Sequence, residues 1–87
     1  MQFSKEKFLP NGSIVLLKGG TKKIVIYGRK QKLMVKEPVM YDYIGCFYPE
    51  GYINPEYTFV FNHEDIEEII FVGFIDEEEE AFVGLLN

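Results

Sequence analysis

The sequence predicts a small α+β domain in which a strongly bent antiparallel sheet is accompanied by two short helices. Short runs of β-branched and aromatic residues alternate with turn residues along most of the chain. Two later segments instead combine helix-capping residues with acidic first turns. The 87 residues, of which 47% are hydrophobic, suffice for one domain with one core. A small SH3-like barrel, closed at one end by the final helix, is the nearest analogy.

The first half of the chain is expected to form a lead-in and three strands. Residues 1–9 are expected to form a loose or short helical lead-in, anchored by Phe3, Phe8 and Leu9. The strands of this half are predicted over residues 13–18, 22–27 and 33–35. The turns that separate them lie at Pro10-Asn11-Gly12, at Gly19-Gly20 and over residues 28–32.

The residues from Met40 to Tyr48 form the clearest strand, because they alternate between two faces. One face would carry Tyr41, Tyr43, Gly45 and Phe47, and the other Asp42, Ile44, Cys46 and Tyr48. A tight turn over Pro49-Glu50-Gly51 follows, and a fifth strand is predicted over residues 57–61.

Two helices and a sixth strand are predicted after Phe61. Asn62 can cap a short helix over residues 62–68, since Asp65 stands where a capping box carries its acid. Residues 69–72 return to β character. Asp76 caps a C-terminal helix over residues 76–86, whose apolar residues are expected to face the sheet. These residues are Phe82, Val83, Leu85 and Leu86.

Charge is divided unevenly along the chain. All nine Lys and Arg lie between Lys5 and Lys36 with a single acid, Glu6, whereas the remainder carries thirteen acids and no base. This gives +8 and −13, with a net charge of −5. Such asymmetry indicates either an interaction surface of one sign or basic strands that neutralise acidic helices beside them, and we favour the second interpretation.

The cysteine content and the apolar runs indicate a cytoplasmic protein. Cys46 is the only cysteine, so an internal disulfide is impossible and a reducing compartment is expected. The charged start lacks the apolar run of a signal peptide, and the run from Ile69 to Ile75 is too short to cross a membrane.

No residue pattern in the chain points to catalysis, a metal or a cofactor. His63 is expected on the surface beside a helix cap, and Cys46 as a small buried hydrophobe without the neighbouring cation that a reactive thiolate needs. One His and one Cys cannot form a zinc site, and the acids from Asp76 to Glu80 lack the spacing of a calcium loop. Residues 18–23 have two glycines among lysines but join two strands, so they form a hairpin turn rather than a phosphate-binding loop.

Three segments resemble one protein family. They are residues 9–20 (LPNGSIVLLKGG), residues 41–52 (YDYIGCFYPEGY), and residues 61–66 (FNHEDI) followed by residues 71–74 (FVGF). Together they resemble the small Firmicute proteins catalogued as domain of unknown function 4176, from about residue 8 to residue 82. The resemblance implies a stand-alone cytosolic protein encoded near type VII secretion loci and their LXG toxins, and it assigns no catalytic residue.

We therefore expect a non-catalytic module that binds a protein partner, such as an LXG toxin or a secretion factor. The best candidate surface is the Tyr-rich strand and turn, formed by Tyr41, Tyr43, Tyr48, Pro49, Glu50, Gly51 and Tyr52. Tyr41 and Tyr43 have an equally good alternative role, as a cover of the core.

Three other interpretations stay open. The protein could be an immunity-type inhibitor that blocks a toxin through Glu77 to Glu80. It could bind nucleic acid on the aromatic and basic first hairpins, which the acidic second half opposes. An exposed edge strand could also pair two copies into a homodimer.

Overall fold

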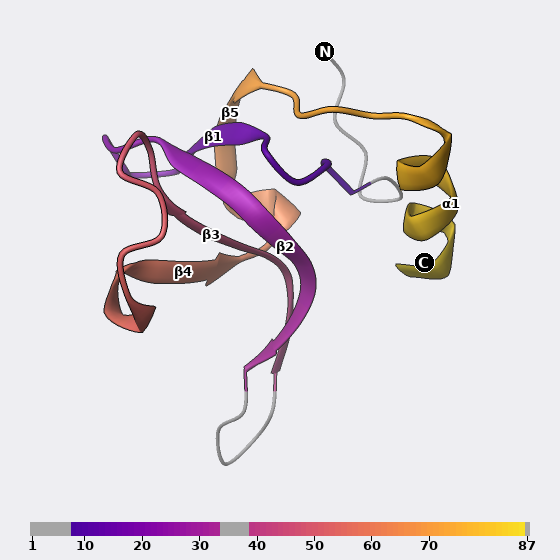
Figure 1. Cartoon of the computed structure of the whole chain (residues 1–87). Coiled ribbons are helices and arrows are strands. Elements are labelled where there is room, and N and C mark those ends of the chain that lie inside the picture. The colour runs from indigo at the N-terminus through magenta and orange to yellow at the C-terminus, as the bar shows by residue number, and fades with distance from the viewer. Residues whose placement is uncertain (1–7, 34–38, 87) are drawn as a thin grey trace.

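The computed structural model describes residues 8–33 and 39–86, and five strands and one α-helix make up its regular structure (Figure 1). The strands are β1 (Ile14–Leu17), β2 (Ile24–Leu33), β3 (Val39–Phe47), β4 (Thr58–Phe61) and β5 (Ile66–Phe71). Two 3₁₀ turns, η1 (Pro55–Tyr57) and η2 (His63–Asp65), flank β4, and the helix α1 (Glu77–Leu86) ends the chain. The predicted α+β class is confirmed.

The strands form one antiparallel sheet in the order β4-β3-β2-β1-β5. The strands β4 and β5 are consecutive in the chain yet lie at opposite edges, and only residues 62–65 connect them. A connector this short forces the sheet to curl until its edges approach each other. The turn η2 bridges these edges where a closed barrel would have ladder hydrogen bonds. The sheet is therefore open, and the expected SH3-like barrel is wrong.

The strand β2 is longer than predicted, because the turn expected over residues 28–32 does not form. The chain instead stays paired with β3 throughout. The paired residues run from Ile24 opposite Phe47 to Leu33 opposite Val39, with a register shift near Gly28. Pairing with β3 supplies hydrogen bonds to a charged segment that has weak strand propensity of its own. Leu33 is thus the end of β2, and the rest of the strand expected over residues 33–35 lies outside the described residues.

The helix predicted over residues 62–68 shrinks to the single turn η2. The local signal is partly right, since the Asp65 carboxylate accepts a hydrogen bond from the Asn62 backbone N–H at 2.9 Å. From Ile66 onward, however, the chain pairs with β1, which places Ile66 and Ile69 against the core. Burial of these isoleucines in a sheet overrides the helical preference of the acids between them.

The core is formed by residues of β1, β2, β3 and β4 together with Leu9 from the segment that precedes β1. Its buried members are Leu9, Val15, Ile24, Ile26, Tyr43 and Phe61. The expected turn at Pro10-Asn11-Gly12 is confirmed, as is the anchoring role of Leu9 and Phe8. Phe3 and the rest of residues 1–7 lie outside the described residues.

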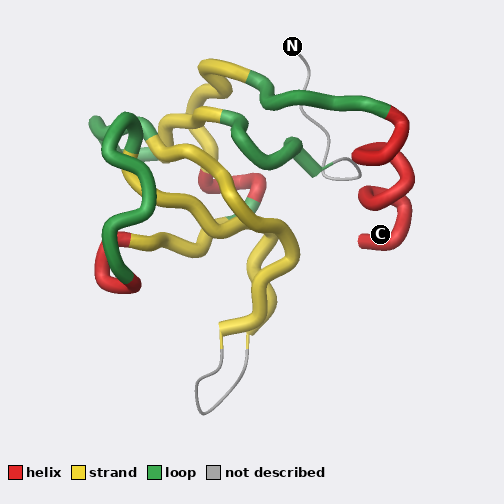
Figure 2. Tube along the Cα trace, in the orientation of Figure 1, coloured by secondary structure: helices red, strands yellow, loops and turns green. Residues whose placement is uncertain are grey.

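The helix α1 begins where the sequence predicts but does not cover the sheet. The Glu79 backbone N–H donates to the Asp76 carboxylate at 2.9 Å, which confirms the predicted cap. Figure 2 shows α1 standing to one side of the sheet, at the end of the extended segment of residues 72–76. The apolar residues of α1 do not join the core: Phe82 and Leu85 are exposed and Val83 and Leu86 are half-buried, although Phe82 lies over the Arg29 guanidinium of β2. Within the described part of the chain, no helix has the length and apolarity needed to span a membrane.

Candidate functional site

The Tyr-rich strand and turn do not form one continuous surface. Tyr48, Pro49, Glu50 and Tyr52 are exposed at the turn after β3, and Gly51 is partly exposed. Tyr41 is half-buried, whereas Tyr43 is fully buried in the core. Tyr43 therefore cannot contact a partner in this structure. Of the two roles expected for it, partner binding and covering the core, the structure shows the second.

The exposed part of this turn is held by local contacts. The Gly51 N–H donates to the Phe47 carbonyl at 2.7 Å, and Gly51 has a φ of 78°, which favours glycine. Glu50 forms an ion pair with Lys22 at 2.8 Å, and this hydrogen-bonded ammonium lowers the pKa of the Glu50 carboxyl. Tyr52 lies edge-to-face with Tyr27, with ring centroids 6.2 Å apart. The turn is thus a small aromatic surface at the end of the sheet opposite α1 (Figure 1).

A buried hydrogen-bond chain passes through Tyr43. The Leu9 N–H donates to the Tyr43 hydroxyl oxygen at 2.8 Å, and that hydroxyl lies 3.0 Å from Nδ1 of His63. Because its oxygen already accepts from Leu9, the natural arrangement is that the hydroxyl donates its own proton to Nδ1. Burial raises the pKa of Tyr43 above its ordinary value. Tyr43 therefore joins the lead-in, β3 and η2 inside the core.

His63 is buried, so its expected position on the surface is wrong. Its backbone N–H donates to the Asp42 carboxylate at 2.9 Å, and the same carboxylate oxygen lies 3.7 Å from its Nε2. Phe8 and Tyr43 cover the ring, with centroids 5.4 and 5.0 Å away. A general base must reach the proton that it removes, and this covered ring does not present itself to a substrate. The Asp42–His63–Tyr43 cluster joins β3 to η2.

Cys46 is a buried residue of β3, as expected. It lies between Val25 of β2 and Thr58 of β4, and burial raises the pKa of its thiol. A raised pKa disfavours the thiolate that a nucleophile or a metal ligand requires. Among the described residues no group of three or more His, Cys, Asp or Glu is placed to hold a metal ion.

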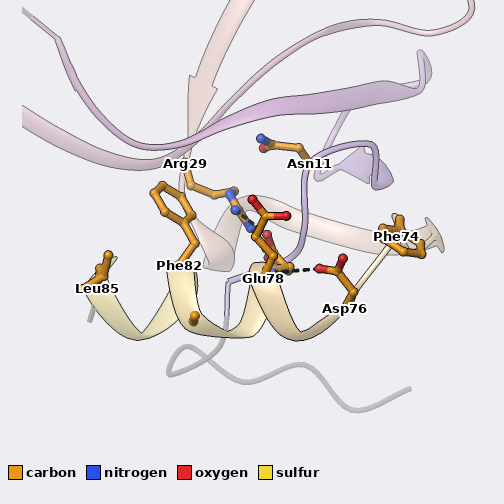
Figure 3. A pocket seen from close by; sticks show the side chains of 9 residues that line it. Asn11, Arg29, Phe74, Asp76, Glu78, Phe82 and Leu85 are labelled. Carbon is orange, nitrogen blue, oxygen red and sulfur yellow. Dashed lines mark hydrogen bonds and ion pairs between the residues drawn. The ribbon is translucent and has the colours of Figure 1, made fainter.

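A further feature, which the sequence did not reveal, is an open groove between α1 and the sheet with a volume of about 810 Å³. We call it the α1 groove. Its lining residues come from the turn before β1, from β2, from residues 72–76 and from α1 (Figure 3). They are Asn11, Arg29, Phe74, Asp76, Glu78, Glu79, Ala81, Phe82 and Leu85.

Arg29 forms the inner end of the groove and attaches the helix to the sheet. Its side chain is buried, and its two terminal nitrogens bond both carboxylate oxygens of Glu79, at 2.6 and 2.8 Å. One of these nitrogens also donates to the Leu9 carbonyl at 3.0 Å. The guanidinium lies 5.4 Å from the centre of the Phe82 ring, and Figure 3 shows the two side chains next to each other. Glu79 therefore already neutralises Arg29, the one cation among the described residues that line the groove.

Apolar side chains remain exposed around the groove. The exposed fractions are 57% for Phe71, 78% for Phe74, 51% for Ile75, 48% for Phe82 and 83% for Leu85. Phe74, Phe82 and Leu85 line the α1 groove, whereas Ile75 lines a neighbouring hollow with Phe8 and Val83. Large apolar side chains left exposed along a groove are typical of binding surfaces. We call these five residues the α1 apolar patch. Phe74 and Ile75 belong to no predicted element, and Phe82 and Leu85 were assigned to the core, so the sequence did not reveal the patch.

Acidic side chains surround the patch. Asp76, Glu77, Glu78 and Glu80 are exposed, and none of them pairs with a Lys or Arg of the described residues. The expected neutralisation of acidic by basic segments holds for Lys22 with Glu50 and for Arg29 with Glu79. At the start of α1 it does not hold, and a strongly negative rim results.

These features define a small α+β protein with an open five-stranded antiparallel sheet and a side-mounted acidic helix. The chain matches the family described as domain of unknown function (DUF4176) over residues 8–82, and it belongs to that family. The matched region includes the whole sheet and the start of α1. Comparisons with curated proteins and with solved structures found no match.

Proposed function

We propose that this protein is a non-catalytic, cytosolic protein-binding module that acts as an accessory factor, chaperone or adaptor for a type VII secreted LXG toxin. The observation that carries the proposal is the α1 apolar patch, whose five large side chains are exposed and three of which, Phe74, Phe82 and Leu85, line the α1 groove. A partner that covered them would gain the free energy of burying that apolar area, about 25 cal/mol for each Å².

The buried positions of the reactive residues support the same proposal. His63 and Tyr43 are covered by one another and by Phe8, and Cys46 lies inside the sheet. The surface of the described residues is instead rich in Phe, Tyr and Ile, residues that bury well at interfaces. The LXG toxin as partner comes from the family resemblance, which places such proteins beside toxin genes.

An immunity-type inhibitor is the second candidate function. The observation that favours it is the exposed row of acids from Glu77 to Glu80, of which only Glu79 is paired with a base among the described residues. Such a row could occupy a basic active site of a toxin. A nucleic-acid binder is the weaker alternative, because the α1 groove carries the wrong charge for phosphate.

Co-expression with a full-length LXG toxin tests the proposal. We expect a tagged copy of this protein to retain the toxin through affinity purification and size-exclusion chromatography, and to raise the amount of secreted toxin. Binding that needs only the isolated toxic domain, together with protection of the cell, would favour the immunity function. A protein that elutes alone after co-expression with each LXG toxin and secretion factor of its own genome would overturn the proposal.

A further inference from the structure

We infer that the α1 groove binds an amphipathic helix of a partner protein, with an apolar stripe against Phe82 and Leu85 and with Lys or Arg against the acidic rim. The inference rests on the proposed function and specifies the chemistry of the partner. It starts from the groove itself, where one wall is apolar, one rim is acidic and the single cation among the described lining residues is already paired.

The shape of the apolar wall favours a helix as occupant. The residues of α1 that line the groove include Glu78, Ala81, Phe82 and Leu85. Their spacings from Glu78 are three, four and seven residues, which places them along one face of the helix. A second helix packs onto such a row by inserting its side chains between these residues, with Ala81 allowing close approach. Phe74 extends the apolar wall beyond the start of the helix, as Figure 3 shows.

The charge of the rim favours a basic occupant. Asp76 and Glu78 line the groove, and Glu77 and Glu80 lie beside them on α1. Arg29 does not balance these four acids, because Glu79 takes both of its terminal nitrogens. Lysines or arginines that flank an apolar stripe would therefore meet an uncompensated negative surface, which accelerates association and fixes orientation.

A second copy of this chain is a poorer occupant. A twofold interface uses the same patch on both sides, so symmetric pairing of two α1 helices would bring the exposed acids of both copies into one interface, with no unpaired base among the described lining residues to balance them. The bases of the chain all lie before residue 37, where the described residues form strands and turns. Among the described residues none of these bases lies on a helix, so we assign the amphipathic basic helix to another protein.

Two synthetic peptides of about 18 residues test the inference by fluorescence anisotropy at about 0.15 M salt. One has leucines on a single helical face and lysines elsewhere, and the other has the same composition with the leucine spacing scrambled. We expect the first peptide to bind at least about tenfold more tightly than the second. Equal binding of the two would overturn the inference, because charge alone would then explain it.

Variants locate the binding site. Phe82→Ser, Leu85→Ser and Glu78→Lys should each weaken binding of the patterned peptide at least about tenfold. Tyr52→Ser and Glu56→Lys are matched controls at the opposite end of the sheet and should leave it unchanged. Circular dichroism verifies that each variant is folded. Binding that survives all three groove variants, or that is lost equally in the controls, would overturn the inference.

Two further outcomes separate this inference from the proposed function. If the groove variants still bind the LXG toxin as tightly as the unaltered protein, the partner uses another surface, so the groove inference fails while the proposed function stands. If analytical ultracentrifugation shows a dimer that Phe82→Ser converts to a monomer, a second copy occupies the groove and the inference is overturned. A monomer whose toxin complex is lost in all three groove variants supports the inference.

Discussion

The Tyr43 hydroxyl is the polar centre of an otherwise apolar core. It accepts a hydrogen bond from the Leu9 N–H and lies 3.0 Å from His63 Nδ1, while its ring packs against Phe8 and Phe61. A backbone N–H buried at this point has no water to replace the hydroxyl. One oxygen atom therefore satisfies groups from two segments that are 54 residues apart in the chain.

Replacing Tyr43 by Phe should lower the free energy of unfolding by about 1–3 kcal/mol, because the Leu9 N–H would be left buried without an acceptor. Urea denaturation at neutral pH measures the change. The matched control is Tyr41→Phe, which removes the hydroxyl of a half-buried tyrosine of the same strand and should change stability by less than about 0.5 kcal/mol. Equal losses in the two variants would contradict the role of the Tyr43 hydroxyl.

Stability should also fall at alkaline pH, and Tyr43 should contribute to the fall. Burial raises the pKa of Tyr43 above the value of 10.0 that an unfolded tyrosine has, so the folded state holds the phenol proton more tightly. The stability that this proton provides is fully present below pH 10 and is lost as the pH rises above it. Urea denaturation at pH 9 and pH 11 should show a larger loss for the unaltered protein than for Tyr43→Phe. Identical losses would contradict this account.

At the scale of residues, the sequence predicts on which face of a strand a side chain lies better than it predicts whether that side chain is buried. The alternation along β3 places Tyr41 and Tyr43 on one face correctly, but it cannot decide whether that face is covered. Tyr43 is covered by Phe8 and His63, which belong to segments far away in the sequence. His63 was misplaced for the same reason, whereas Cys46, a small apolar residue of a strand with neighbours on both sides, is buried as predicted.

At the scale of elements, the segment of residues 72–76 is fixed to the turn before β1 at Gly73. The Gly73 N–H donates to the Ser13 hydroxyl at 3.0 Å, and that hydroxyl donates to the Pro10 carbonyl at 2.7 Å. A Cβ added to Gly73 would lie 2.3 Å from the Asn11 carbonyl oxygen. This contact determines where the chain leaves the sheet and hence where α1 stands.

Gly73→Ala should destabilise the protein by about 1–3 kcal/mol, since the backbone must move to admit the methyl group. Gly84→Ala is the matched control: nothing lies within 4 Å of its added Cβ, and alanine favours the interior of α1. That control should leave stability unchanged or raise it by up to about 1 kcal/mol. Thermal unfolding of both variants checks the prediction, and a neutral Gly73→Ala would show that the segment is not packed against Asn11.

The attachment of α1 depends on the ion pair between Arg29 and Glu79. Glu79→Gln should lower the free energy of unfolding by about 3 kcal/mol, because a buried guanidinium loses its carboxylate. Glu80→Gln, one residue further on at an exposed position, should change it by less than about 0.5 kcal/mol. Urea denaturation distinguishes the two variants. Similar stabilities would mean that Arg29 does not hold the helix.

Most elements could be predicted from local sequence, and the exceptions share one cause. The strands β1, β3 and β4 and the cap of α1 follow from residue spacing and turn residues. The second half of β2 and the start of β5 do not, because pairing with β3 and β1 decides their conformation. The position of α1 beside the sheet depends on Gly73 and on the pair of Arg29 with Glu79, which join residues 60 and 50 positions apart.

At the scale of the whole molecule, the uneven division of charge along the sequence leaves acids at the start of α1 that pair with no Lys or Arg of the described residues. Opposite charges meet at two ion pairs of the described residues, but the acids at the start of the helix are left facing solvent beside exposed Phe74 and Leu85. The result is a molecule whose helix stands beside the sheet and leaves Phe82 and Leu85 exposed along the α1 groove. A partner surface on α1 accounts for both the exposed apolar side chains and the unbalanced charge.

Amide hydrogen exchange, followed by mass spectrometry with and without the partner, tests this account most directly. In the complex with an LXG toxin or with the patterned basic peptide, we expect slower exchange over residues 74–86 and little change over residues 48–52. Protection confined to residues 48–52, with residues 74–86 exchanging as in the free protein, would contradict the assignment of α1 as the partner surface.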